Sequence, residues 1–149
     1  MNFEPVIFRE YDIRGVFKEQ FDLHFVELLG RSFATYLRKH GSTSNPIITV
    51  GHDARLSSPS IVQSLAKGLS ESGVHVKLIG MVTTPMSYYT TFAFKEVEGS
   101  IMVTGSHNPP SYNGFKISAG NKTLFGDKIQ ELRQIMEARD FSAAEGSVE

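Results

Sequence analysis

Residues 47–62, IITVGHDARLSSPSIV, decide the fold because they join a strand to a helix through a polar loop. Residues 47–50 are a short apolar run of the kind that is buried inside a sheet. Ser58 and Pro59 then have the form of an N-cap followed by proline at the first helical position. Apolar residues recur on one side of this predicted helix, which stops at Gly73.

The same order of elements continues along the chain. Strands are predicted at 74–79 and 100–103, and Thr84-Pro85 opens a helix between them. The apolar residues of this helix are Met86, Tyr89, Phe92 and Ala93. Two successive strand–helix–strand crossovers imply parallel strands with helices packed against the sheet, which is the α/β class.

Further elements are predicted on both sides of this unit. They are a short strand at 6–8, a helix at 22–40, a hairpin of 116–118 with 122–124, a helix from Asp127 and a linker at 143–147. The two helices each carry one apolar face, so they are expected to pack on the core. His24 and His40 are expected at the surface.

Composition excludes several classes of function. A chain of 149 residues with 40% hydrophobic residues fits one globular domain. A net charge of −1 with mixed signs predicts no nucleic-acid or membrane partner. The absence of cysteine excludes disulfides and thiolate chemistry. Residues 1–8 lack the features of a signal peptide, so a cytoplasmic protein is expected.

Residues 104–116, TGSHNPPSYNGFK, form a loop that presents a hydroxyl group. Gly105 removes a Cβ before Ser106, which lets a bulky anion approach the backbone. The Pro109-Pro110 pair stiffens the loop, and Asn113-Gly114 predicts a two-residue turn before a strand. If the apolar residues of that strand face the core, Lys116 points the other way and can reach back towards Ser106.

Four interpretations of Ser106 compete. It can lie in an ordinary polar turn, or be the nucleophile of a serine hydrolase, although no G-x-S-x-G elbow is present and His107 is its direct neighbour. It can belong to a nucleotide-binding loop, but the G-x-x-x-x-G-K-[ST] pattern is absent. The fourth interpretation is a phosphoserine that donates its phosphoryl group, which requires nearby cations.

The predicted topology brings three loops together. Residues 51–57, 80–83 and 105–110 all follow strands, so they emerge at the carboxyl edge of the sheet, where open α/β folds bind ligands. Arg55 is therefore expected to approach Ser106. Asp53 and Arg55 can form a structural ion pair or contact a ligand, and neither is predicted to be catalytic.

Two motifs resemble a known family. TGSHNPPSYNGFK at 104–116 closely resembles the phosphoserine loop of the α-D-phosphohexomutases, and FREYDIRG at 8–15 resembles the N-terminal motif of their phosphomannomutase/phosphoglucomutase branch. The resemblance implies that residues 1–140 are the first domain of such an enzyme, a three-layer α/β/α sandwich with a mostly parallel, partly mixed sheet. Residues 141–149 are then the start of a linker to a missing second domain.

The resemblance also implies a reaction and roles for its residues. Hexose 6-phosphate and hexose 1-phosphate interconvert through phosphorylated Ser106 and a hexose 1,6-bisphosphate, which also serves as activator. Lys116 and Arg14 stabilise charge, and His107 relays a proton or braces the loop. Tyr11 lies near the transferring phosphate, Asn108 braces the loop or bonds the phosphate, and Mg²⁺ binds a phosphate oxygen on Ser106.

This chain also departs from the family pattern. It has no Asp-Gly-Asp sequence, so the remaining magnesium ligands are expected in a missing domain. The expected partners are a phosphosugar and the missing domains, and the chain alone is expected not to turn over. The alternatives are a stand-alone phosphosugar-binding module and the first domain of a phosphoglucosamine mutase.

Overall fold

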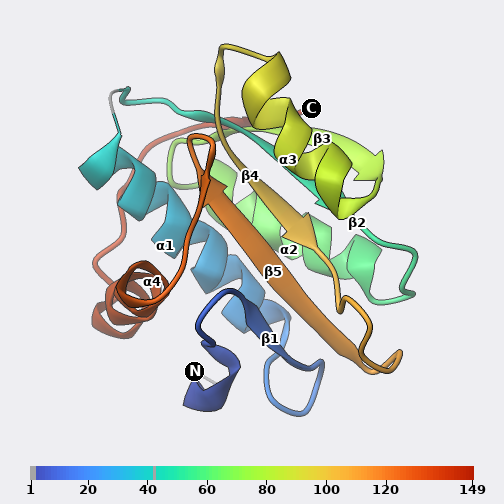
Figure 1. Cartoon of the computed structure of the whole chain (residues 1–149). Coiled ribbons are helices and arrows are strands. Elements are labelled where there is room, and N and C mark those ends of the chain that lie inside the picture. The colour runs from blue at the N-terminus through green and yellow to red at the C-terminus, as the bar shows by residue number, and fades with distance from the viewer. Residues whose placement is uncertain (1–2, 42) are drawn as a thin grey trace.

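The computed structural model describes residues 3–41 and 43–149, so Met1 and Asn2 of the predicted domain lie outside the described residues. A mixed sheet forms the middle of the molecule (Figure 1). Its strands, in spatial order, are β1 (Ile13–Val16), β5 (Tyr112–Ala119), β4 (Val97–Val103), β2 (Ile47–His52), β3 (His75–Met81) and β7 (Ser147–Val148). The short β6 (Lys122–Thr123) pairs with β5.

The centre of the sheet is parallel and one side of it is antiparallel. β2 runs parallel to both β3 and β4, as the two crossovers predict. β5 runs antiparallel to β4 and β1, which makes the sheet mixed. The predicted α/β class with a partly mixed sheet is therefore confirmed.

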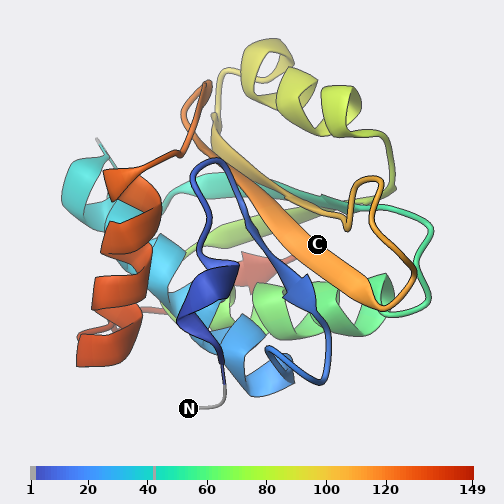
Figure 2. The same cartoon turned by 60° about the horizontal axis from the view of Figure 1, so that its bottom comes forward.

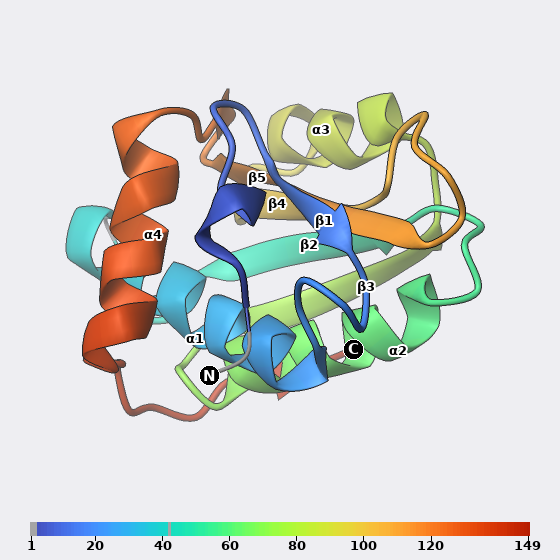
Figure 3. The ribbon, with the colours of Figure 1, turned by 90° about the horizontal axis from the view of Figure 1, so that it is seen from below.

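Helices cover both faces of the sheet. On one face lie α1 (Leu23–His40), α2 (Ser58–Ser70) and α4 (Asp127–Ala138), and on the other lies α3 (Thr84–Ala93) (Figures 2 and 3). This arrangement is the predicted three-layer α/β/α sandwich. None of the helices in residues 3–41 and 43–149 has the length and apolar content needed to cross a bilayer.

The core lies between the sheet and α1, where Phe25, Leu29 and Phe33 are fully buried. Asp22 caps α1 by accepting a hydrogen bond from the backbone N–H of Phe25 at 2.8 Å, and the last turn carries the basic residues Arg38, Lys39 and His40, which a helix C-terminus favours. His24 and His40 are exposed, as expected. This layer is the rigid support for the loops at the sheet edge.

The N-terminal segment differs from the prediction. The strand expected at 6–8 is a 3₁₀ turn, Pro5–Ile7, because Pro5 lacks an N–H donor and sits in its first turn. The strand lies instead at β1, which begins inside the charged 8–15 motif. It forms there because Ile13 pairs with Phe115 of β5.

Asn113 and Gly114 do not form a turn. Both lie inside β5, opposite Gly15 and Arg14 of β1, and Asn113 is fully buried. A Cβ on Gly114 would lie 2.4 Å from the carbonyl oxygen of Ile13, so this glycine permits close approach of two strands.

The first residues of two helices are shifted from the prediction. Ser57 and Thr83, each one residue before the predicted cap, hold the N-cap positions of α2 and α3 without a side-chain capping bond. The apolar residues Met86, Tyr89 and Phe92 of α3 are exposed. The hairpin of β5 with β6 and the helix from Asp127 are confirmed.

Residues 141–149 lie against the domain. Gly146 donates a hydrogen bond to the carbonyl oxygen of Ser70 at 2.8 Å, and β7 pairs in parallel with β3. The segment expected as a free linker therefore includes an edge strand. That it leads on to a second domain stays a prediction.

Candidate active site

Ser106 lies at the carboxyl edge of the sheet, in the loop that follows β4. In Figure 3 this loop and the loop after β2 lie together at one end of the sheet. Ser106 is exposed and has a left-handed backbone with φ 55°, while its N–H donates to the hydroxyl of Thr104 at 2.9 Å. Its Oγ lies 3.5 Å from Nδ1 of His107, so these neighbours do approach each other.

Arg55 holds the Ser106 loop by donating hydrogen bonds to backbone carbonyl groups of that loop. Nη2 donates to the carbonyl oxygens of Ser106 at 3.0 Å and Asn108 at 2.7 Å. Nη1 donates to those of Pro109 at 2.5 Å and Tyr112 at 3.1 Å. The expected approach of Arg55 to Ser106 is therefore confirmed. The contact consists of hydrogen bonds from the guanidinium group to carbonyl oxygens along most of the loop.

Asp53 anchors the same assembly. Its carboxylate accepts hydrogen bonds from Arg55 Nε at 3.0 Å, the hydroxyls of Thr104 at 2.8 Å and Ser58 at 2.7 Å, and the N–H of Gly105 at 3.2 Å. Burial acts to raise the pKa of Asp53, but the hydrogen bonds from Ser58, Thr104, Arg55 and Gly105 outweigh it and hold this pKa below its usual range. Of the two roles left open for Asp53 and Arg55, the structural ion pair is present.

Replacing Asp53 by asparagine is expected to destabilise the fold at neutral pH. The side chain is 21% exposed, so we expect the low end of a charged hydrogen-bond contribution, about 2 kcal/mol of unfolding free energy. That loss corresponds to roughly 4–8 °C in Tm for a domain of this size. Thermal unfolding at pH 7 measures it, with Asp140→Asn at an exposed position as the control.

The same substitution predicts a pH dependence. Because the folded pKa of Asp53 is lowered, the stabilisation is present above the unfolded value of about 3.9 and is lost as pH falls through the folded value. The Tm difference between the wild-type chain and Asp53→Asn should therefore shrink below about pH 4. A difference that stays constant from pH 7 to pH 3 would contradict this assignment.

Arg14 and Lys116 lie on the sheet face opposite the core. Their strand neighbours Ile13 and Phe115 are buried in the core, and side chains alternate along a strand. Arg14 Nη1 donates to Oδ1 of Asn108 at 2.7 Å, which ties β1 to the Ser106 loop. The predicted cation pair thus lies on one face, and one member contacts the loop directly.

Asp12 joins the two cations and was not singled out by sequence reasoning. Its Oδ2 lies 3.5 Å from Arg14 Nε and 3.3 Å from Lys116 Nζ, and the residue is only 7% exposed. The signal that marks it is its place beside Arg14 in the 8–15 motif. A single carboxylate therefore orients both predicted charge-stabilising residues.

Two predicted site residues, Tyr11 and Lys116, have no hydrogen bond to residues 104–112 within the described part of the chain. Tyr11 is 71% exposed, and Lys116 bonds to Asp12. Ser106, His107, Asn108 and Arg14 do gather around one loop.

The residues present do not make a complete magnesium site. Among residues 3–41 and 43–149, no group of three or more His, Cys, Asp or Glu side chains is arranged to hold a metal ion. The two carboxylates near the loop, Asp12 and Asp53, are engaged in ion pairs with arginine or lysine. In the predicted mechanism, a phosphate group on Ser106 is the magnesium ligand that this domain contributes.

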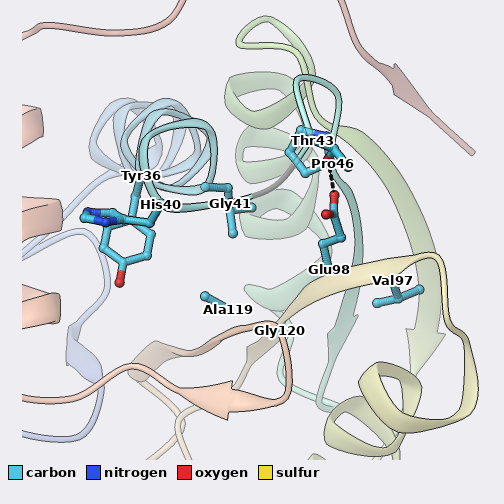
Figure 4. Close-up of a pocket in the computed structure, with 10 residues that line it drawn as sticks. Tyr36, His40, Gly41, Thr43, Pro46, Val97, Glu98, Ala119 and Gly120 are labelled. Atoms are coloured by element: carbon cyan, nitrogen blue, oxygen red, sulfur yellow. Dashed lines mark hydrogen bonds between the residues drawn. The ribbon is translucent and has the colours of Figure 1, made fainter.

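A separate cavity of about 480 Å³ lies at the opposite edge of the sheet (Figure 4). It is lined by residues at the start of β2 and β4 and at the end of β5, among them Pro46, Val97 and Ala119. Glu98 accepts a hydrogen bond from Thr43 within it. None of the predicted site residues lines this cavity.

The chain is similar in sequence to a known family of proteins. Residues 5–143 match the family described as phosphoglucomutase/phosphomannomutase, alpha/beta/alpha domain I. A phosphoglucomutase of Neisseria meningitidis is 43% identical over 95% of the chain, and a phosphomannomutase/phosphoglucomutase of Pseudomonas aeruginosa is 42% identical over 96%. The chain spans 30% of the length of each of these relatives.

A solved structure is also similar. The crystal structure of a phosphoglucomutase/phosphomannomutase family protein from Burkholderia thailandensis superposes with a TM-score of 0.90 and 37% identity. The superposition covers 99% of this chain and 33% of that one.

Proposed function

The chain belongs to the phosphoglucomutase/phosphomannomutase family, as its α/β/α domain I, and from this we propose that it carries the phosphoserine of a cytoplasmic hexose phosphate mutase. The enzyme interconverts hexose 6-phosphate and hexose 1-phosphate of glucose or mannose. The observation that carries the proposal is an exposed Ser106 on a loop whose backbone is held by Arg55, with Arg14 bonded to the same loop.

The proposed reaction consists of two successive phosphoryl transfers. In the first, the bond between phosphorus and Oγ of Ser106 breaks and a new bond forms to the free sugar hydroxyl, which gives a hexose 1,6-bisphosphate. The sugar hydroxyl loses its proton and Oγ of Ser106 gains one. In this proposal His107, whose Nδ1 lies 3.5 Å from Oγ, exchanges that proton. In the second transfer the other phosphate returns to Ser106, so the enzyme ends as it began.

The proposed reaction brings negatively charged phosphate groups close together, and they repel each other. A phosphoserine and a phosphosugar each bring about two negative charges at neutral pH. Lys116 and Arg14 offset part of this repulsion, since a unit pair at 4 Å is worth about 4 kcal/mol at an effective dielectric of 20. Asn108 accepts a hydrogen bond from Arg14, and in this proposal it braces the loop or bonds the phosphate. Tyr11 is proposed to lie near the transferring phosphate.

Other parts of a longer protein complete the site in this proposal. The chain spans about a third of its relatives, so the metal ligands and the sugar-selective contacts are proposed to come from further domains. Magnesium, bound chiefly there, would neutralise charge on the transferring phosphate. The 149-residue chain alone is then expected not to turn over.

Phosphate mapping tests the proposal. Intact mass and peptide mapping are done before and after incubation with glucose 1,6-bisphosphate, on this chain and on a chimaera that joins it to the remaining two thirds of the Neisseria meningitidis relative. We expect phosphate on Ser106 of the chimaera and conversion of glucose 1-phosphate to glucose 6-phosphate, but no turnover by the chain alone.

Other outcomes would overturn it. Turnover by the chimaera without modification of Ser106 would remove the phosphoserine from the mechanism. Tight phosphosugar binding by the chain, with no phosphate in either protein, would support a binding module instead.

A further inference from the structure

We propose that Arg55 is a positioning residue that fixes the orientation of Ser106 for phosphoryl transfer, an inference that rests on the proposed function. Arg55 lies on the loop after β2, and its bonds reach residues more than fifty positions along the chain. Three observations support this role. They are the acceptors of its N–H groups, its close approach to Gly105 and the left-handed backbone conformation of Ser106.

All five N–H donors of the guanidinium group have acceptors. Nε donates to Asp53, and the two terminal nitrogens each donate to two carbonyl oxygens of the loop, as described above. An arginine presents five donors in one rigid plane, whereas lysine has three on a flexible stem. Only arginine can therefore hold residues 106, 108, 109 and 112 together from one point.

With its donors occupied, Arg55 has none left for a phosphate. The side chain is also only 14% exposed. Its charge is balanced by Asp53 at 3.0 Å. The cations that face the substrate in the proposal are therefore Arg14 and Lys116, and Arg55 acts through the loop.

Gly105 fits the guanidinium group. A Cβ at Gly105 would lie 2.4 Å from Cζ and 2.6 Å from Nε of Arg55, which no side chain can occupy without moving one of them. The missing Cβ of Gly105, which was expected to let an anion approach, leaves room for the guanidinium group of Arg55 close to the backbone before Ser106.

The backbone of Ser106 explains why such support matters. Its φ of 55° is in the left-handed region, which a serine adopts at an energetic cost. Arg55 bonds the carbonyl of Ser106 itself, while Thr104 accepts its N–H. Without Arg55 the loop can relax, and a displacement of about 1 Å at a reacting atom can cost 10²-fold in rate.

The first test uses this chain and requires no enzymatic activity. Amide hydrogen exchange is measured for Gly105, Ser106 and Asn108 in the wild-type chain, in Arg55→Lys and in Arg133→Ala, which removes a surface arginine of α4. We expect at least tenfold faster exchange in the loop for Arg55→Lys, with the central residues of β2 and β4 unchanged. Unchanged loop exchange would overturn the proposal.

The second test asks whether loop order controls transfer. In the chimaera, Arg55→Lys should slow phosphorylation of Ser106 about 100-fold, and Gly105→Ala should have a similar effect by displacing the guanidinium. In Arg55→Ala, added guanidinium ions should restore part of the rate, whereas methylammonium should not. A purely structural role would lower Tm without this selective rescue.

The two proposals can fail separately. If the wild-type chimaera never carries phosphate on Ser106, the proposed function fails, and the exchange experiment still decides whether Arg55 orders the loop. If the chimaera is phosphorylated but Arg55→Lys reacts within threefold of it, Arg55 is not a positioning residue.

Discussion

Replacing Ser106 by glycine is expected to abolish phosphoryl transfer in the chimaera while leaving the fold intact. The glycine removes Oγ, which is the atom that carries the phosphate in the proposed mechanism. Glycine also accepts the φ of 55° at this position without strain, whereas alanine would keep the left-handed penalty. Glucose 1-phosphate conversion is the measurement, and no activity above background should remain.

The control for this loss lies in the same loop. Ser111 is exposed, and its carbonyl oxygen accepts a hydrogen bond from the N–H of Phe17 at 3.0 Å, a contact that glycine keeps. Ser111→Gly should therefore keep the wild-type rate. Activity in Ser106→Gly above one per cent of wild type would mean that another group accepts the phosphate.

Replacing Lys116 by methionine is expected to lower the transfer rate by roughly 10²–10³, the range for one charge-stabilising donor in an active site. Methionine keeps the length of the stem and its packing but removes the ammonium group. The rate of Ser106 phosphorylation by glucose 1,6-bisphosphate in the chimaera measures the effect. The loss should appear in kcat and kcat/KM together if Lys116 acts in the transition state.

Stability must be separated from chemistry here, because Lys116 is 3.3 Å from the buried Asp12. In Lys116→Met the carboxylate of Asp12 keeps Arg14 as an ion-pair partner, so only part of its charge compensation is lost. Thermal unfolding of Lys116→Met measures that loss separately from the transfer rate. Lys122→Met, at an exposed position of β6, is the matched control. A rate within threefold of wild type in Lys116→Met would rule out its proposed role.

The parallel part of the fold could be predicted because its signals are local. Apolar runs bounded by loops and serine or threonine before proline place β2, β3, β4, α2 and α3 to within a few residues. The crossover rule then brings the loops after β2 and β4 together, which is why the approach of Arg55 to Ser106 could be foreseen. These signals depend on neighbours in the sequence, so they survive without knowledge of the tertiary structure.

The remaining differences come from contacts between distant segments. Asn113-Gly114 has the composition of a turn, but pairing with β1 draws it into a strand. The charged residues around Asp12 look like a solvated loop until β5 supplies a partner. Arg55 was expected either to form an ion pair or to contact a ligand. Its hydrogen-bond acceptors are carbonyl groups more than fifty residues away along the chain, so its local sequence could not decide between these roles.

The position of β7 determines where the chain can be truncated or fused to another protein. Residues 147–148 cover the edge of β3 by parallel pairing, and the backbone of Leu78 bonds to the carbonyl oxygen of Glu149 at 2.7 Å. A chain shortened to residue 140 would leave that edge open to pairing with another molecule, which favours aggregation. Any fusion, circular permutation or exchange of domains should therefore keep residues 141–149 with this domain and place its junction after them.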